Sequence, residues 1–344
     1  GQLGKALGYL NRYSGGAFFI AAADLLGSTS INEAGKEFAS GFYASGSNED
    51  TRTLSIGGIC EDAMSGVLAG ISSFGKHVGV GASYGAFLAP LGHIAARLHA
   101  IGNQARRERG AEPAQPMILI CGHAGLKTGE DGPTHADPQP LQLLQENFPP
   151  GAMITLTPWD PAEIWYLLSA AFSRHPSIIA PFVTRPNETV VDREALRLAP
   201  ASHAVRGVYA LRSPSGTPDA TIVLQESGVT YAFVTETLPM LDRAGLDVEV
   251  FYVASAELFD ALPAAERERI FPERKAQRAI GITGFTLPTM YRWIRSDTGR
   301  ALTMHPYMHG HYPGSGSGKA VIAEAGLDGV SQYERIVELV TSRA

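Results

Sequence analysis

The chain has 344 residues, of which 44% are hydrophobic and 18% charged, and its formal net charge at pH 7 is −6. This length suits two globular domains better than one, and the apolar content excludes an intrinsically disordered chain. Acidic residues outnumber basic ones and the lysines and arginines form no stripe, so the sequence offers no electrostatic basis for a nucleic-acid partner.

The first long apolar run, residues 15–26, is interrupted by Asp24 and is too short to span a bilayer. No charged segment with a cleavage site precedes it, so we expect no secretory leader. Cys60 and Cys121 both lie in apolar, strand-like runs, which indicates neither a disulfide framework nor a cysteine metal site. A cytoplasmic protein with no membrane partner is the expectation.

Strand-like and helical patterns alternate along the first half of the chain. Runs typical of strands occupy residues 17–23, 54–57, 117–121, 153–156 and 181–184. Between them, apolar residues with helical spacing at 63–71, 88–101 and 164–172 predict helices with an apolar face. Alternation of this kind predicts a parallel sheet with helices on both faces, a three-layer α/β domain.

A second, smaller α/β domain is expected after a segment rich in proline, serine and glycine at 190–218. A strand at 221–224, a helix at 232–241 that ends at Gly245 and a strand at 248–253 form the pattern of a βαβ crossover. We therefore predict one domain at 1–192 and another at 193–344.

The most distinctive segment follows the predicted strand 117–121 and runs from His123 to His135. It reads His-Ala-Gly-Leu-Lys-Thr-Gly-Glu-Asp-Gly-Pro-Thr-His. Loops at the carboxyl ends of parallel strands are where α/β proteins bind ligands, so a functional site is predicted here. Gly-Glu-Asp-Gly-Pro-Thr-His, with a histidine eight residues before Asp131, resembles the signature loop of transketolases. His-Ala-Gly-Leu also resembles the related deoxyxylulose phosphate synthases, which carry arginine where this chain has His123.

The resemblance covers nearly the whole chain and implies both a fold and a reaction. The fold would be a thiamine diphosphate pyrimidine-binding domain followed by a transketolase C-terminal-like domain. The reaction would transfer a two-carbon ketol unit from a ketose or ketose phosphate donor to an aldehyde acceptor. A decarboxylating deoxyketose or acyl synthase of the same superfamily stays open as an alternative.

The resemblance also implies which residues hold the cofactor. Glu61 opens the predicted helix and matches the glutamate that hydrogen-bonds N1′ of the aminopyrimidine and promotes proton transfer there. Tyr84 and Phe87, counted from it without gaps, match aromatic residues that line the pyrimidine pocket. A glutamate at a helix start more often only balances the helix dipole, but its spacing to the other matches favours a catalytic role.

Six residues are implied to contact the sugar substrate. They are Asp24, Ser28, His123, Asp131, His135 and Arg185. Ser28 and Arg185 would bind a phosphate, because a guanidinium fork suits oxyanion geometry. Asp131 would hold the C2 hydroxyl of the donor. His123 would assist Arg185 at the phosphate, and His135 would contact the donor near its reacting end. Both histidines are also implied to be catalytic residues.

A partner subunit is implied as well. Whole transketolases carry a Gly-Asp-Gly motif and a downstream asparagine that bind Mg²⁺ and the diphosphate, and this chain contains no Gly-Asp-Gly. The resemblance thus implies activity only with a second chain that supplies the Mg²⁺ ligands and the diphosphate-binding half. The expected assembly is a heterotetramer built on a homodimer of this chain.

Two further patterns suggest other functions. Gly81-Ala82-Ser83-Tyr84-Gly85 fits the Gly-x-Ser-x-Gly pattern of α/β serine hydrolases, with Ser83 as nucleophile and Asp260 and a downstream histidine as partners. The downstream histidines are His305, His309 and His311, which could also suggest zinc. Residues 314–319 mimic a phosphate-binding loop but lack its Ser or Thr, so a flexible turn is expected.

Overall fold

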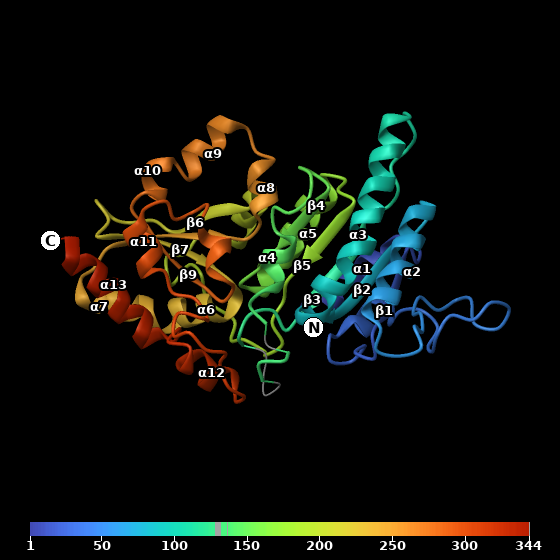
Figure 1. Cartoon of the computed structure of the whole chain (residues 1–344), viewed down its shortest axis with the longest axis horizontal. Helices are drawn as coiled ribbons and strands as arrows, with labels where there is room; N and C mark the ends of the chain where they lie inside the picture. Colours follow the sequence, from blue (N-terminus) through green and yellow to red (C-terminus); the bar gives the residue numbers. More distant parts are fainter. Residues whose placement is uncertain (128–131, 136, 344) are drawn as a thin grey trace.

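The computed structural model describes residues 1–127, 132–135 and 137–343, and contains two sheets flanked by helices (Figure 1). All pairs in the first sheet are parallel, in the order β1-β2-β3-β5-β4. Its strands are β1 (Phe18–Ala22), β2 (Val78–Tyr84), β3 (Met117–Gly122), β4 (Met153–Leu156) and β5 (Ile178–Pro181). Its helices are α1 (Gln2–Tyr13), α2 (Glu61–Phe74), α3 (Gly85–Glu108), α4 (Pro140–Leu144) and α5 (Ile164–Phe172), with 3₁₀ turns at Ile31–Gly35 and Pro161–Glu163.

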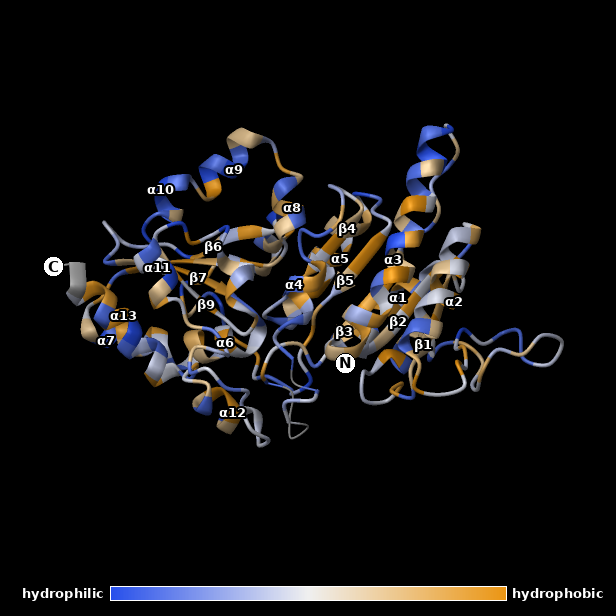
Figure 2. Ribbon diagram, in the orientation of Figure 1, coloured by the Kyte–Doolittle hydropathy of each residue, from blue (hydrophilic) through white to orange (hydrophobic). Residues whose placement is uncertain are grey.

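Helices cover both faces of this sheet, as the sequence predicts. Buried side chains of α1 and α5 pack on one face, and those of α2, α3 and α4 pack on the other. In Figure 2 the strands are the most continuously hydrophobic elements, because a parallel sheet buried on both faces has no polar side. The three-layer α/β fold of the first part is therefore confirmed.

The second sheet has the order β6-β8-β7-β9, in which β6 pairs antiparallel with β8 and the other pairs are parallel. Its strands are β6 (Val208–Arg212), β7 (Ala220–Gln225), β8 (Val248–Val253) and β9 (Ala279–Thr283). The helices around it are α6 (Ser227–Ala232), α7 (Leu238–Ala244), α8 (Ala256–Asp260), α9 (Ala264–Ile270), α10 (Glu273–Ala276), α11 (Asp297–Leu302), α12 (Gly318–Glu324) and α13 (Gly329–Arg343), with 3₁₀ turns at Ala201–Arg206 and Leu287–Met290 and a π-helical turn at Phe233–Thr237.

The predicted βαβ crossover joins β7 to β8, and Gly245 ends its helix in the left-handed conformation. The predicted boundary at residue 192 lies in the connection between β5 and β6. It stays a prediction. Among the described residues, none of the helices combines the length and the apolar character needed to cross a lipid bilayer.

One predicted strand is absent, and one strand of the structure was not predicted. Residues 54–57 form no strand: Leu54 N donates to the carbonyl of Ile20 (2.8 Å), but Gly57 and Gly58 then adopt positive φ angles and turn the chain toward α2. Strand β2, in the interior of the sheet, was not predicted as a strand. Glycines interrupt its apolar run, and a Cβ at Gly79 would collide with the backbone of Leu68 in α2. The predicted strand 181–184 begins three residues earlier, as β5.

The helix predictions are correct, but the face that α3 buries is not the predicted one. Of the predicted apolar face, Leu88 is buried whereas Leu91, Leu98 and Ile101 are exposed. Helix α3 instead packs on α2 and the sheet through smaller residues, such as Gly92, whose added Cβ would lie 2.9 Å from Ser65 Oγ. The large aliphatic side chains are therefore left on the outer side of α3.

The second sheet's domain covers the open edge of the first sheet at β4. The Glu257 carboxylate, on α8, accepts hydrogen bonds from Thr155 N (3.1 Å) and Thr155 Oγ1 (2.7 Å), and also from Glu146 N (3.0 Å). An edge strand exposes unpaired backbone groups, and these contacts satisfy one of them. The two halves are thereby held in a defined arrangement.

Candidate active site

The carboxyl ends of the parallel strands bring together most residues that the sequence singles out. Tyr84 ends β2, His123 follows β3 directly, Arg185 lies shortly after β5, and Asp24 follows β1. Parallel strands end at one edge of a sheet, so segments far apart in the sequence meet there. Asp131 lies outside the described residues.

Glu61 is the first residue of α2 and is only 2% exposed. Its Oε1 accepts a hydrogen bond from Ser83 Oγ (2.7 Å), a buried hydroxyl of β2. Its Oε2 accepts no hydrogen bond from any residue that the structure describes. A buried carboxylate with an open acceptor at a helix N-terminus is suited to hold a donor group of a ligand.

Three aromatic rings gather around Tyr84, which follows the Glu61 partner Ser83 in β2. The His123 ring stacks on Tyr84 with a centroid distance of 3.7 Å and an interplanar angle of 20°. His135 meets Tyr84 and Phe87 edge-on, at 5.3 and 5.4 Å. The group therefore forms an aromatic wall that fits a planar heterocycle, although His123 covers one face of the Tyr84 ring. His123 adopts a φ of +53°, which non-glycine residues seldom do.

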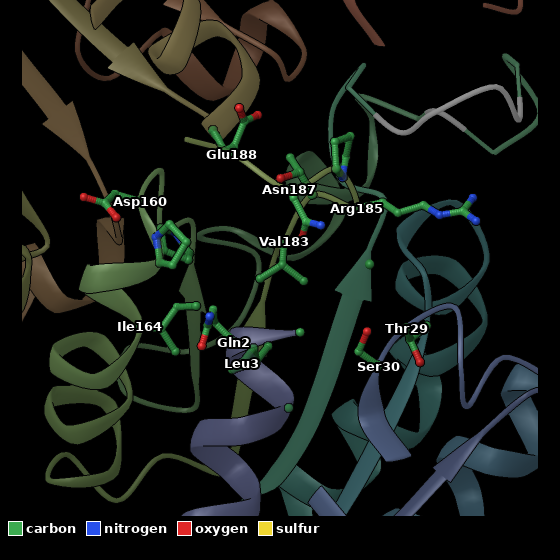
Figure 3. A pocket seen from close by; sticks show the side chains of 18 of the residues that line it. Gln2, Leu3, Thr29, Ser30, Asp160, Ile164, Val183, Arg185, Asn187 and Glu188 are labelled. Carbon is green, nitrogen blue, oxygen red and sulfur yellow. The ribbon is translucent and has the colours of Figure 1, made fainter. Parts of the chain in front are cut away.

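A cavity of about 490 Å³ lies next to this wall and is lined by Ser28, His123 and Arg185. Figure 3 shows this cavity, with Arg185 labelled. The cavity brings together three of the six residues predicted to contact a substrate. Asp24 is not among its lining residues, and it is exposed with a φ of +59°. A cavity of this size suits a small metabolite.

The charges around the cavity are arranged so that its acids are neutralised. Asp160 Oδ2 accepts a hydrogen bond from Arg193 Nε (2.8 Å), and Glu188 is paired with Lys127. In Figure 3 the Arg185 guanidinium points away from the Asp160 and Glu188 carboxylates. The two acids thus have cationic partners of their own, and Arg185 extends along another side of the cavity.

Several lining residues were not predicted. Trp159 and Asp160 follow β4, so the rule that ligands bind at strand ends could have indicated them. Ser227 and Tyr231 come from α6, next to the second sheet. No pattern in the sequence predicts that the second domain contributes to this cavity.

Glu226 fixes the loop after β3 against the second domain. It follows β7 with a φ of +95°, and its carboxylate accepts hydrogen bonds from Gly228 N (2.7 Å) and Val229 N (3.0 Å). A Cβ added at Gly125 would lie 2.8 Å from Glu226 Cδ, and one at Gly284 would collide with the same carboxylate. Burial raises the pKa of Glu226 to about 7.

The alternative functions lack structural support. Ser83 lies within β2, fully buried, and donates to Glu61 rather than to a histidine, so the serine-hydrolase arrangement is wrong. In the described part of the chain, no group of three or more His, Cys, Asp or Glu side chains could hold a metal ion, so His305, His309 and His311 form no zinc site there. In the glycine-rich turn, Ser317 caps helix α12.

Known proteins resemble the chain in both sequence and fold. The family described as "Transketolase, pyrimidine binding domain" matches residues 5–187. Transketolase 1 of Pasteurella multocida is 28% identical over 253 residues, which cover 73% of this chain and 35% of that protein. The chain thus spans about a third of the length of the curated relatives it matches.

Two solved structures show the likeness in fold. A transketolase from Leishmania mexicana superposes with a TM-score of 0.79 at 19% identity, covering 99% of this chain and 45% of that one. A structure described as a split gene transketolase, inactive beta4 tetramer, has a TM-score of 0.63 at 18% identity. That match covers 99% of this chain and 97% of the other, so the two have nearly the same extent.

Replacing Glu226 with Gln is expected to flatten the pH dependence of stability. With a pKa near 7 in the folded chain and about 4.5 when unfolded, this carboxyl stabilises the fold below pH 4.5, and that contribution is lost as the pH rises through 7. Each pKa unit is worth about 1.4 kcal/mol. Urea unfolding of both proteins between about pH 4.5 and 8 measures the difference.

The matched control is Glu268→Gln, an exposed glutamate on α9, which should leave the wild-type slope unchanged. If the free energy of unfolding of Glu226→Gln runs parallel to that of the wild type across this interval, Glu226 does not carry a raised pKa.

Proposed function

Because this chain belongs to the transketolase family, we propose that it is one subunit of a split, thiamine diphosphate-dependent transketolase-like enzyme. Residues 1–192 would bind the pyrimidine end of the cofactor, and residues 193–344 would form the C-terminal domain. The enzyme would move a two-carbon ketol unit from a ketose or ketose phosphate to an aldehyde. The observation that carries this proposal is the buried Glu61 at the start of α2, hydrogen-bonded to Ser83, the residue before Tyr84 of the aromatic wall.

The residues of this wall fit the pyrimidine ring of the cofactor. Glu61 has an open carboxylate oxygen that would hold a proton at N1′ of the ring, and its burial strengthens such a hydrogen bond. Tyr84 and Phe87 would border the ring plane. When bound, thiamine diphosphate supplies the electron sink that ketol transfer needs. His123 and His135 would exchange protons with the reacting end of the donor.

The adjoining cavity is the proposed substrate pocket. Ser28 and Arg185 would bind a phosphate, with His123 between them and the aromatic wall. Asp24 and Asp131 are also proposed to contact the substrate, on the family resemblance alone. The volume of about 490 Å³ suits a sugar phosphate rather than a polymer.

A partner subunit would supply the diphosphate-binding half together with the Mg²⁺ ligands. The chain's extent matches almost completely that of the split-gene neighbour. A surface suited to a partner also begins at the proposed cofactor site. We define it as the apolar stripe, a set of large side chains between 46% and 76% exposed on α2 and α3. It consists of Val67, Phe74, Leu91, Ile94, Leu98 and Ile101.

The stripe has the geometry of a helix-packing seam. On α3 its members follow Phe87 at alternating intervals of four and three residues, as in a coiled-coil seam. Helices α2 and α3 lie next to each other in the layer beside the sheet (Figure 1). An exposed apolar patch of this extent marks an interaction surface. The proposed diphosphate-binding chain would cover it and so bring its half of the cofactor to Glu61.

Replacing Glu61 with Gln is expected to slow proton exchange at C2 of thiamine diphosphate by about two to four orders of magnitude. The amide keeps the volume of the side chain but cannot accept and return the proton at N1′. Hydrogen–deuterium exchange at C2, followed by NMR on the complex with the partner subunit, measures the rate.

Asp62→Asn is the matched control, because Asp62 is the next residue on α2 and is exposed. It should leave the exchange rate unchanged. An exchange rate in Glu61→Gln equal to that of the wild-type complex would remove Glu61 from the mechanism and the proposed function with it.

Replacing Leu98 with Asp is expected to weaken association with the diphosphate-binding subunit by about tenfold or more, because a charge would be buried at the seam. Sedimentation of the mixed subunits measures association, and circular dichroism checks the fold. The control is Val330→Asp, which places the same charge at an exposed apolar position on α13. Equal association by both variants would show that the stripe is not the contact surface.

A further inference from the structure

A second cavity, of about 460 Å³, lies in the second domain along β6. Strand β6 is at the edge of its sheet, near α9 and α10 (Figure 1). The cavity is lined by residues of the 3₁₀ turn Ala201–Arg206, of the strand itself and of α9 and α10. None of its lining residues lines the candidate active site. It is therefore a separate cavity, to which the proposed function gives no role.

The lining of this cavity is strongly basic. Four cationic side chains line it, and Glu249 is its one acid among the described residues. The cations are Arg197, Arg206, Arg269 and Lys275. The chain as a whole has 34 acidic and 28 basic residues, so the excess of positive charge here runs against the overall balance.

The single acid neutralises only one of these cations. Lys275 Nζ lies 2.6 Å from Glu249 Oε1 and 4.5 Å from the centre of the Phe251 ring, so this ammonium is already paired. The remaining three positive charges in the lining are all guanidinium groups, which recognise phosphate oxygens through paired hydrogen bonds.

The positive charges of these three arginines are only weakly compensated by acidic side chains. Arg197 lies 3.8 Å from Asp242 and Arg269 lies 3.7 Å from Glu266, both long and exposed contacts that contribute little. The Arg206 guanidinium makes no hydrogen bond or ion pair with any residue that the structure describes. Like charges gathered in a concave site repel one another and raise the local potential, which a bound anion would relieve.

The apolar floor suits the carbon skeleton of a ligand. Leu198, Leu211 and Ile270 line the cavity together with the cations. Next to Arg206, His203 also lines it, and burial together with the charge of Arg206 lowers the pKa of His203. The neighbouring imidazole thus tends to be neutral and able to donate or accept a hydrogen bond. The combination of guanidinium groups, an apolar floor and metabolite-sized volume is that of a small-molecule site.

We propose that this cavity binds a small phosphate-bearing metabolite at a site distinct from the active site, held by Arg197, Arg206 and Arg269. The site needs no cofactor and no partner subunit, so it stands independently of the proposed function.

The test is isothermal titration of the full chain with inorganic pyrophosphate at constant ionic strength. Wild-type chain should bind it saturably, and Arg206→Gln and Arg269→Gln should each weaken binding by about tenfold. Arg269 is 67% exposed, so its replacement leaves the fold intact even where Arg206→Gln disturbs it. Arg12→Gln, an exposed arginine on α1, is the control and should bind like the wild type.

Titration of Arg185→Ala separates the two cavities. Retained pyrophosphate binding by Arg185→Ala supports the proposal. If Arg185→Ala loses binding while Arg206→Gln binds fully, pyrophosphate binds in the active-site cavity and the proposal is wrong. Failure of wild-type chain to bind saturably, or unchanged affinity in a double Arg206→Gln, Arg269→Gln variant, would also overturn it. None of these outcomes bears on proton exchange at the proposed cofactor site.

Discussion

Two carboxylates are buried at the interface between the two domains. Glu163 belongs to the first domain and Glu226 to the second. A buried carboxylate costs several kcal/mol unless partners satisfy it. Glu163 accepts hydrogen bonds from Arg193 Nη2 (2.9 Å) and from Tyr209 Oη, groups that belong to the inter-sheet connection and to β6. Glu226 is satisfied by backbone N–H groups at the start of α6. The two halves cannot shift without breaking the hydrogen bonds that Arg193 and Tyr209 donate to Glu163.

The candidate site depends on this interface between the domains. Glu226 lies against Gly125, and Lys127 is paired with Glu188, so the loop after β3 and the segment after β5 are held to each other and to the second domain. The same two segments carry His123 and Arg185. The cavity beside them is therefore shaped by both domains, although the aromatic wall belongs to the first domain alone.

The sequence predicts well what local patterns determine. The rule that ligands bind at strand ends predicted a site at His123, the family resemblance added Arg185, and both residues line one cavity. Helical spacing predicted α3. Prediction from the sequence fails where tertiary packing determines which residues form a strand or which face of a helix is buried. Strand β2 was missed because glycines such as Gly79 interrupt its apolar pattern, and the close approach of α2 leaves no room for a side chain at Gly79. Leu98 was placed on the apolar face of its helix, but helical spacing alone does not say which face the rest of the protein covers. Glu226 carries no motif, and only its contacts reveal its role.

We propose that this chain holds only the pyrimidine end of thiamine diphosphate and needs a second chain to bind the diphosphate. Isothermal titration of thiamine diphosphate with Mg²⁺, first on this chain and then on its complex with the diphosphate-binding subunit, tests that claim most directly. We predict weak or undetectable binding by the chain alone and tight binding by the complex. Tight binding and full turnover by this chain alone would contradict it.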